Sequence, residues 1–280
     1  MSVYVMSVIS ELKREVEEAQ RTSVSVDERL REGLVTGAGD SYAVCLALEG
    51  VTKGRFRCVD PYELLGWNFR KPLLIISVSG RPRVLRSLAE RQRGKGKILL
   101  ITANPRSKLF ELADRKIVIP FSPPDSPRPG MGSFLLTLRA AYSLADHEEV
   151  VGVGREVKIG RTPVFVGQGG NFGIAYFSYL KMAEIFGEPS NAERLEQFLH
   201  SPIFASVGRK VIVLSSGDER ERKLKERGGR SFVMTGCRTS LCNAVSIIRS
   251  IIAEMERRSW EKVYFAENES ILKLSSHMIY

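Results

Sequence analysis

The sequence predicts an α/β protein made of two doubly wound α-β-α sandwiches, each built on a parallel sheet. The first observation is a repeated turn: an apolar run ends in Gly37-x-Gly39 and, 130 residues later, in Gly167-x-Gly169. Each turn passes straight into a helical pattern, where glycine permits a sharp bend and leaves backbone N–H groups free for an anion. The second observation is the alternation of short apolar runs with helical segments, which is typical of doubly wound sheets.

Five strands are expected in the first half of the chain. They are short and apolar on both faces, as are parallel strands covered by helices on both sides. Their predicted ranges are 33–37, 56–60, 73–79, 97–102 and 116–121. Helical patterns follow at 41–49, 83–93, 108–114 and 133–146, and the N-terminal residues begin an amphipathic helix.

A proline-rich segment at 122–132 interrupts this pattern, because four prolines and two glycines cannot form the interior of a helix or sheet. The second half then repeats the scheme. Its strands are expected at 163–167, 210–215 and 231–235, with a last candidate at 263–266, and its helices at 171–186, 191–199, 218–227 and 240–257. The helix at 171–186 is apolar nearly all round, so we expect it at the centre of the molecule. We place the N-terminal domain, with its leading helix, at 1–147 and the C-terminal domain at 148–280.

The composition favours a cytoplasmic protein over a membrane or nucleic-acid-binding protein. No apolar run reaches the roughly 18 residues of a membrane span, and the N-terminus lacks the pattern of a signal peptide. The net charge of +10 comes from bases interleaved with acids, as in 219–227, which is typical of a solvated helix face. A basic protein also attracts phosphorylated metabolites. The four cysteines have no metal-type spacing and indicate neither zinc nor redox chemistry, and Cys45 and Cys58 have the apolar neighbours of core residues.

Small polar residues follow three strands of the first half, in Gly37-Ala-Gly-Asp-Ser41, Ser77-Val-Ser-Gly80 and Thr102-Ala-Asn-Pro-Arg-Ser107. Ligands of open α/β sheets bind beyond the carboxyl ends of the strands. The three loops are therefore predicted to form an anion cradle, with Arg81 and Arg83 nearby to supply positive charge. Each loop alone would be explained as ordinary capping and turn residues.

These motifs resemble the sugar isomerase (SIS) domain, and the second half resembles another such domain through Gly167-x-Gly, Leu180-Lys-Met-Ala-Glu184 and Glu196-Gln-Phe-Leu-His-Ser-Pro202. Tandem proteins of this family include phosphoglucose/phosphomannose isomerases, sugar-phosphate deaminases and the isomerase domain of glucosamine-6-phosphate synthase. The resemblance implies a phosphorylated sugar as ligand, a homodimer, and neither a metal nor an organic cofactor. The resemblance implies a phosphate site made of loop glycines, serines and a neighbouring cation: Gly37, Gly39, Ser41, Ser77, Val78, Ser79, Gly80 and Arg81. Pro82 departs from the family, which usually has Thr there.

The catalytic pair is predicted to be Glu196 and His200, which lie one helical turn apart. A carboxylate and an imidazole in this arrangement can open a sugar ring and carry a proton between C1 and C2 through an enediol. The alternative is an exposed pair that only stabilises its helix. Lys273 and His277 near the C-terminus are candidate contributors to the site, with a frayed tail as the alternative. Lys181 and Glu184 are expected to pair at a domain or subunit contact.

The leading hypothesis is thus an aldose–ketose isomerase of a hexose phosphate. An amino-sugar phosphate deaminase, the isomerase half of an amidotransferase and a non-catalytic sugar-phosphate sensor are the alternatives.

Overall fold

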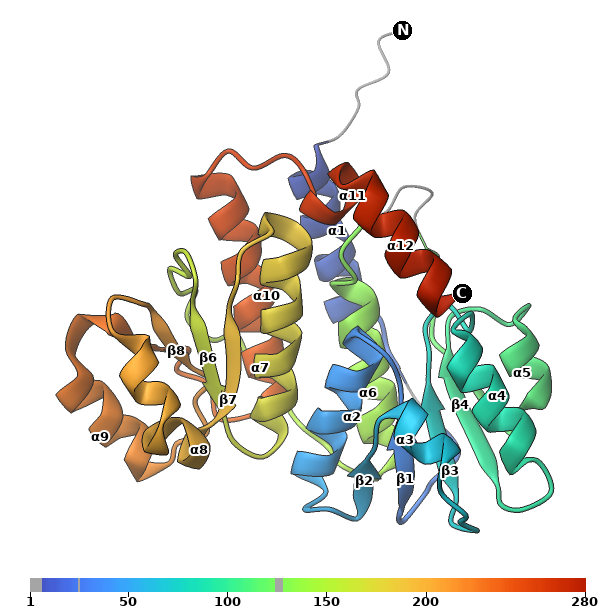
Figure 1. Cartoon of the computed structure of the whole chain (residues 1–280). Helices are drawn as coiled ribbons and strands as arrows, with labels where there is room; N and C mark the ends of the chain where they lie inside the picture. The colour runs from blue at the N-terminus through green and yellow to red at the C-terminus, as the bar shows by residue number, and fades with distance from the viewer. Residues whose placement is uncertain (1–6, 25, 124–127) are drawn as a thin grey trace, which may run out of the picture.

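The computed structural model describes residues 7–24, 26–123 and 128–280, which form two β-sheets (Figure 1). The first sheet has the order β2-β1-β3-β4-β5 and the second has the order β7-β6-β8-β9. The strands of the first sheet are β1 (Gly33–Thr36), β2 (Phe56–Cys58), β3 (Leu73–Ile76), β4 (Ile98–Thr102) and β5 (Arg115–Val118). Those of the second are β6 (Val164–Gly167), β7 (Asn191–Arg194), β8 (Val211–Val213) and β9 (Phe232–Met234). Every strand pair found in these residues is parallel, which confirms the α/β class.

The helices largely follow the predicted pattern. In the first half they are α1 (Val8–Arg21), α2 (Asp40–Val51), α3 (Pro61–Leu65), α4 (Arg83–Gln92), α5 (Lys108–Leu112) and α6 (Gly132–Leu144). In the second half they are α7 (Gly170–Lys181), α8 (Leu195–His200), α9 (Glu219–Gly228), α10 (Ser240–Arg257), α11 (Tyr264–Glu267) and α12 (Glu269–Ile279). A π-helix, η1 (Met182–Phe186), extends α7, and two short 3₁₀ helices are η2 (Pro202–Ser206) and η3 (Gly229–Ser231). The expected start of α1 among residues 1–6 lies outside the described residues.

Two predicted elements are wrong. Residues 191–194 form strand β7 and not the start of a helix, because they pair with β6 from Val164↔Asn191 to Gly167↔Arg194. This edge position is a tertiary contact that the helical spacing of the residues did not reveal. Residues 263–266 include helix α11 rather than a last strand. Helix α3 was not predicted; Asp60 begins it by accepting a hydrogen bond from Tyr62 N at 2.8 Å, with Pro61 at its first position.

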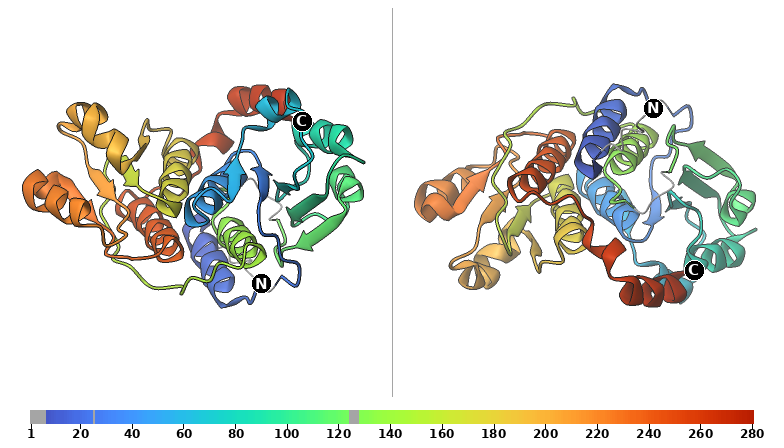
Figure 2. Two further views of the ribbon diagram at one scale, coloured as in Figure 1. Left: turned by 90° about the horizontal axis from the view of Figure 1, so that it is seen from below. Right: turned by 90° about the horizontal axis from the view of Figure 1, so that it is seen from above.

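A shared layer of helices separates the two sheets, as Figure 2 shows from above and below. One core cluster joins the inner faces of both sheets to α1, α2, α6, α7 and α10, while separate clusters pack α3–α5 and α8–α9 on the outer faces. Alternate residues of the strands face the two sides: Leu74 and Ile76 point into the shared core, and Leu73 and Ile75 point outward. This two-sided burial explains the continuous apolar runs in the sequence.

Helices α2 and α7, each starting at a Gly-x-Gly turn, cross at the centre of the shared layer. The crossing depends on glycine, because a Cβ added at Gly173 would lie 2.4 Å from the backbone oxygen of Ala43. The rings of Phe134 and Phe177 stack beside it with centroids 3.8 Å apart. The prediction that the helical segment beginning near residue 171 is buried at the centre is therefore confirmed. The division of the chain at residue 147 stays a prediction.

The cysteines differ from the expectation that they carry no redox chemistry. Cys237 and Cys242 form a disulfide, with Cα atoms 5.6 Å apart. The first follows β9 and the second lies in the first turn of α10, so the sharp turn into the helix brings two thiols five residues apart into contact. Cys45 is buried as predicted, whereas Cys58 is only half-buried. Within the described part of the chain, no helix is long and apolar enough to cross a membrane.

Candidate functional site

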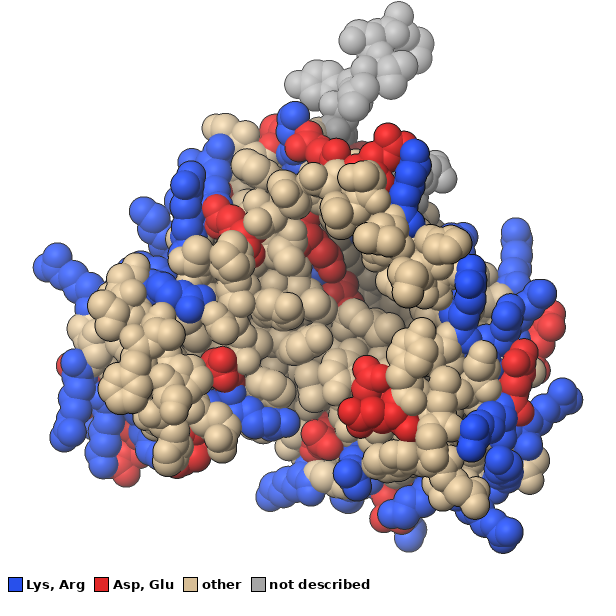
Figure 3. Space-filling view, viewed as in Figure 1, with Lys and Arg blue, Asp and Glu red and all other residues tan. Residues whose placement is uncertain are grey.

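A pocket of about 470 Å³ lies at the carboxyl end of the first sheet, and we call it the cradle pocket. Its walls come from the loops after β1 and β3, the start of α6, the π-helix and the end of the chain. The lining residues include Gly39, Asp40, Ser41, Ser77, Val78, Ser79, Pro82, Arg128, Ser133, Glu184 and Tyr280. In the space-filling view, the surface below α12 is hollowed between the two halves, and most of its visible lining is uncharged (Figure 3). Five of the eight residues predicted for the phosphate site thus line one pocket.

The Ser77–Gly80 loop is held rigidly from behind. The Val78 carbonyl accepts hydrogen bonds from Ala103 N at 3.0 Å and from the Thr102 hydroxyl at 3.2 Å, and the Ser79 carbonyl accepts one from Asn104 Nδ2 at 2.9 Å. Among the described residues, no acceptor is found for the N–H groups of Val78 and Ser79. A loop with its carbonyls bound on one side and its N–H groups free on the other is suited to an anion.

The conformation of this loop requires a glycine at its end. Gly80 has φ +64°, and a Cβ there would lie 2.3 Å from Ser107 Oγ. Gly80 and Arg81 do not line the cradle pocket, and Gly37 lines the neighbouring cavity instead. These three residues therefore shape or flank the site rather than face it.

The corresponding loop of the second half already holds an anion, the carboxylate of Glu221. Thr36 and Val166 each precede the first glycine of their turn, and they pair with Ile75 and Val213 on the next strand. Three and four residues further on, Val78 and Ser79 therefore correspond to Ser216 and Gly217. The N–H groups of Ser216 and Gly217 donate to Glu221 Oε2 at 2.8 and 3.2 Å, and the Ser216 hydroxyl donates to Oε1 at 2.8 Å. By the same count, Arg83 stands where the second half has Glu221. The repeat therefore contains its own example of an anion bound by this loop.

A buried cation connects the two halves beside the cradle pocket. Lys181 is fully buried, and its Nζ donates to Asp40 Oδ2 at 2.7 Å and to Glu184 Oε2 at 2.5 Å. The predicted pairing of Lys181 with Glu184 at a contact between the halves is thus confirmed. The other Asp40 oxygen, Oδ1, is buried without a hydrogen-bond partner in the described residues.

Burial raises the pKa of Asp40 to about 7, against the attraction of Lys181, and repulsion from Glu184 adds to the rise. The pKa of Lys181 is raised because the two carboxylates outweigh its desolvation. The pocket therefore contains a carboxyl group that can gain or lose a proton near neutral pH, beside a carboxylate held by a fixed ammonium group. In the sequence, the one available sign of this cluster was Lys181 and Glu184 at spacing i, i+3 on an otherwise apolar helix.

Glu196 and His200 lie outside this pocket. They are paired as predicted, with His200 Nε2 3.3 Å from Glu196 Oε1, but their side chains are 58% and 71% exposed on α8. Arg220 also binds Glu196, at 3.0 Å. Within one chain, the structure does not bring this pair to the phosphate loops.

The C-terminal segment reaches the site through other residues than those predicted. Ile279 and Tyr280 line the cradle pocket, and Arg83 Nε donates to the backbone oxygen of Tyr280. Lys273 instead pairs with Glu269 at 2.6 Å on the exposed side of α12, and His277 is exposed. The expectation that the tail approaches the site agrees with the geometry, but the two named side chains face solvent.

No family model matches the chain, and no curated protein matches it in sequence. Solved structures do match over most of its length. The C-terminal domain of glucosamine-fructose-6-phosphate aminotransferase from Francisella tularensis has a TM-score of 0.68 and 14% identity, covering 94% of this chain and 99% of that chain. Glucosamine-6-phosphate deaminase from Thermotoga maritima has a TM-score of 0.64 and 19% identity, covering 89% and 92%. Tagatose-6-phosphate ketose/aldose isomerase from Escherichia coli has a TM-score of 0.62 and 16% identity, covering 89% and 86%.

The chain shares its fold with these three proteins. Because every identity is below 20%, the likeness carries no residue roles with it, and the chemistry has to be argued from the cradle pocket itself.

Proposed function

We propose that this chain is a tandem SIS-domain protein that binds a phosphorylated hexose in the cradle pocket and interconverts its aldose and ketose forms. The observation that carries the proposal is the meeting of two features in one pocket: a loop with free N–H groups, and the Asp40–Lys181–Glu184 cluster. The first suits a phosphate and the second suits proton transfer. The similar folds of an isomerase and a deaminase of sugar phosphates support the same substrate class.

The phosphate would be held by the N–H groups of Val78 and Ser79 and by the hydroxyls of Ser41, Ser77 and Ser79. The carboxylate of Glu221 in the other half supports this geometry, since it accepts hydrogen bonds from the corresponding loop. Arg81 and Arg83, just before and at the start of α4, flank the pocket and would add positive charge near the phosphate. Pro82 precedes α4 and gives it no side-chain cap, so the first N–H groups of that helix are also available.

The proton-transfer base in this proposal is Glu184, in place of Glu196. It would remove the proton from C2 of the aldose while Asp40, neutral below its raised pKa, donates a proton to the carbonyl oxygen on C1, which forms an enediol. Return of a proton from Glu184 to C1 and transfer of the O2 proton to Asp40 then yields the ketose. Lys181 fixes the orientation of both carboxyl groups, and no external oxidant or cofactor enters the balance.

The test is turnover of hexose 6-phosphates by the purified protein in D₂O, followed by NMR for both product and deuterium at C1 or C2. Glu184→Gln should lower the rate by about 10²- to 10⁴-fold, because it removes a general base and keeps the shape of the side chain. Glu196→Gln is the matched control and should keep the wild-type rate. The reverse pattern, with loss in Glu196→Gln alone, would return the catalytic role to the exposed pair.

Two alternatives are outcomes of the same experiment. Ammonia release from glucosamine 6-phosphate would identify a deaminase, which the fold shared with the Thermotoga maritima deaminase makes the second candidate. Binding of hexose phosphates with neither turnover nor deuterium exchange would identify a sensor.

We also propose that the protein is a homodimer. Its location in the cytoplasm stays a prediction from the sequence, and the Cys237–Cys242 disulfide, a bond typical of oxidising compartments, counts against it. The surface of η2 supports an interface, since Phe204 and Val207 are large apolar side chains that are 78% and 87% exposed. Light scattering should give twice the 31.3 kDa mass of the chain, and Phe204→Asp should lower that value.

A further inference from the structure

A second cavity, of about 540 Å³, lies on the other side of the Gly37–Gly39 turn, and we call it the tyrosine groove. Its lining includes Tyr42, Asp60, Tyr62, Tyr176, Met278 and Ile279. It adjoins the cradle pocket, since Ala38, Gly39, Pro82 and Ile279 line both. The proposed reaction uses no residue that belongs to the tyrosine groove alone.

The walls of the groove are aromatic and come from both halves of the chain. Tyr42 on α2 and Tyr176 on α7 meet edge to face, with ring centroids 5.7 Å apart, and Tyr176 contacts Tyr179 at 5.6 Å. Both Tyr42 and Tyr176 are half-buried, and burial raises the pKa of each hydroxyl, so the phenols stay protonated and can donate hydrogen bonds. Such amphipathic rings pack against the apolar face of a ligand ring and bind its polar edge.

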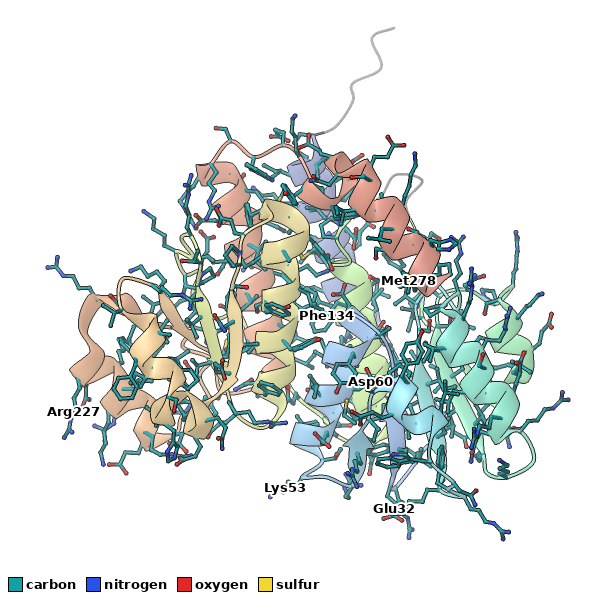
Figure 4. The ribbon with its side chains drawn as sticks, viewed as in Figure 1. Glu32, Lys53, Asp60, Phe134, Arg227 and Met278 are labelled. Atoms are coloured by element: carbon teal, nitrogen blue, oxygen red, sulfur yellow. A yellow bond between two sulfur atoms is a disulfide. The ribbon has the colours of Figure 1, made fainter. Side chains whose placement is uncertain are left out.

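One carboxylate stands in the groove, on Asp60 at the carboxyl end of β2. Its Oδ1 accepts the hydrogen bond from Tyr62 N that starts α3, which leaves Oδ2 for a ligand. Figure 4 labels Asp60 beside α3 and Met278 above it at the end of α12, on opposite sides of the groove. No Lys, Arg or His is among the described residues that line the groove. A carboxylate without a cation accepts hydrogen bonds from hydroxyl groups and repels phosphate.

The position of Asp60 relative to the glycine turn is also specific. It lies two residues after the end of β2, the strand next to β1, and follows Gly37 by 23 residues. In dinucleotide-binding sheets, whose first strand ends in a G-x-G-x-x-G turn, an acidic residue about 20 positions on binds a ribose hydroxyl. This chain keeps the first two glycines of that turn and has Tyr42 at the third position. Aromatic walls and a hydroxyl-accepting carboxylate therefore occur together where a sugar ring would fit.

We propose that the tyrosine groove is a second ligand site, which binds an uncharged ring with neighbouring hydroxyl groups, either a pyranose or the ribose of a nucleoside. The ring packs on Tyr42 and Tyr176, and Asp60 accepts hydrogen bonds from its hydroxyls. The site stands independently of the reaction in the cradle pocket. The Gly37–Gly39 turn would separate a ligand in the tyrosine groove from one in the cradle pocket.

The experiment measures equilibrium binding of two phosphate-free probes, adenosine and methyl α-D-glucopyranoside, to the full chain by calorimetry. At least one probe should bind saturably, and the probe that binds identifies the source of the ring. Asp60→Asn should weaken that binding at least tenfold, because the charge is lost while asparagine still caps α3. Glu63→Gln, on the exposed side of α3, is the matched control and should change it less than twofold.

Failure of both probes to bind, or equal binding by Asp60→Asn and Glu63→Gln, would overturn the proposal. Ser77→Ala distinguishes binding in the tyrosine groove from binding in the cradle pocket, where the proposed reaction takes place. It alters the cradle pocket alone and should leave probe binding unchanged; weakened binding would place the probe in the cradle pocket and also overturn the proposal.

Discussion

The carboxyl ends of the two sheets have corresponding loops, but one loop lies beside an open pocket and the other binds a side chain of the protein. At the first sheet, Val78 and Ser79 in the loop after β3 line an open pocket, and no acceptor is found for their N–H groups among the described residues. At the second sheet, the loop after β8 is closed by the carboxylate of Glu221. The difference teaches that two copies of one turn can diverge: the second is filled by a side chain of the fold, and the first is left open for the ligand that we propose.

The helices behind the two glycine turns differ in the same way. Ser41 in α2 lines the cradle pocket, whereas Asn171, at the corresponding position of α7, donates to the carbonyls of Leu214 and Ser215 at 3.1 and 3.3 Å. A Cβ at Gly170 would lie 2.4 Å from Val51, so the second turn is packed against α2. The second copy of the turn is thus used for packing.

The largest loss of stability is expected from removing Lys181, the buried cation beside the cradle pocket. Lys181→Met should lower the free energy of unfolding by about 3–5 kcal/mol, since it leaves Asp40 and Glu184 without a counter-ion. Arg220→Met at the second sheet breaks ion pairs with Asp218 and Glu196 that are exposed to solvent and therefore contribute little to stability. Urea unfolding of both variants measures the contrast, and equal losses would contradict it.

A paired serine substitution tests which loop binds phosphate. Ser77→Ala should weaken the binding of a hexose 6-phosphate about 10- to 100-fold, the loss of one hydrogen bond to a charged group. Ser216→Ala should leave that affinity unchanged, because its hydroxyl is bound to Glu221. Titration calorimetry decides, and a larger effect of Ser216→Ala would assign the ligand to the second sheet.

Removing the Glu221 carboxylate should leave the loop after β8 able to bind an anion from solution, as we propose for the loop after β3. Glu221→Ala removes the acceptor of three hydrogen bonds and should cost about 1–3 kcal/mol of stability. Added sulfate should then raise the melting temperature of the variant more than that of the wild type, because the freed N–H groups take an outside anion. An identical response to sulfate in both proteins would show that the loop needs its carboxylate for its shape.

Asp40 and Asp218 should contribute to the free energy of unfolding with opposite dependences on pH. The pKa of Asp40 is raised, so the folded state keeps a proton that the unfolded chain releases, and its contribution to stability falls as pH rises from about 4 to about 7. The slope is at most about 1.4 kcal/mol per pH unit. Hydrogen bonds from Arg220 and Gln168 lower the pKa of Asp218, whose contribution is present above pH 4 and is lost as the pH falls below it.

Unfolding of Asp40→Asn and Asp218→Asn across this pH range separates the two contributions. Asp40→Asn should flatten the loss of stability between pH 4 and pH 7, and Asp218→Asn should not. A wild-type slope that persists unchanged in Asp40→Asn would contradict the burial of that carboxyl group.

Much of the lining of the cradle pocket could be predicted from the sequence, because polar loops follow the strands. Ser41, Ser77 and Ser79 come directly after apolar runs, and parallel strands bring their carboxyl ends to one edge. Glu184, which we propose as the base, was not singled out for that role from the sequence, because it reaches the pocket only through the crossing of α7 over α2, and sequence spacing does not tell which helices cross. The Glu196–His200 pair had the right chemistry and spacing, but its helix lies on the outer face of the second sheet.

The sequence by itself determined the parallel sheets, the two glycine turns and the strand-end loops, because backbone geometry and burial on both faces of a strand are local requirements of these residues. Only the tertiary structure decided which loop stays open, which carboxylate faces the pocket, and that residues 191–194 pair as a strand. Those outcomes depend on contacts between segments far apart in the chain, such as Lys181 with Asp40, and no local pattern encodes them.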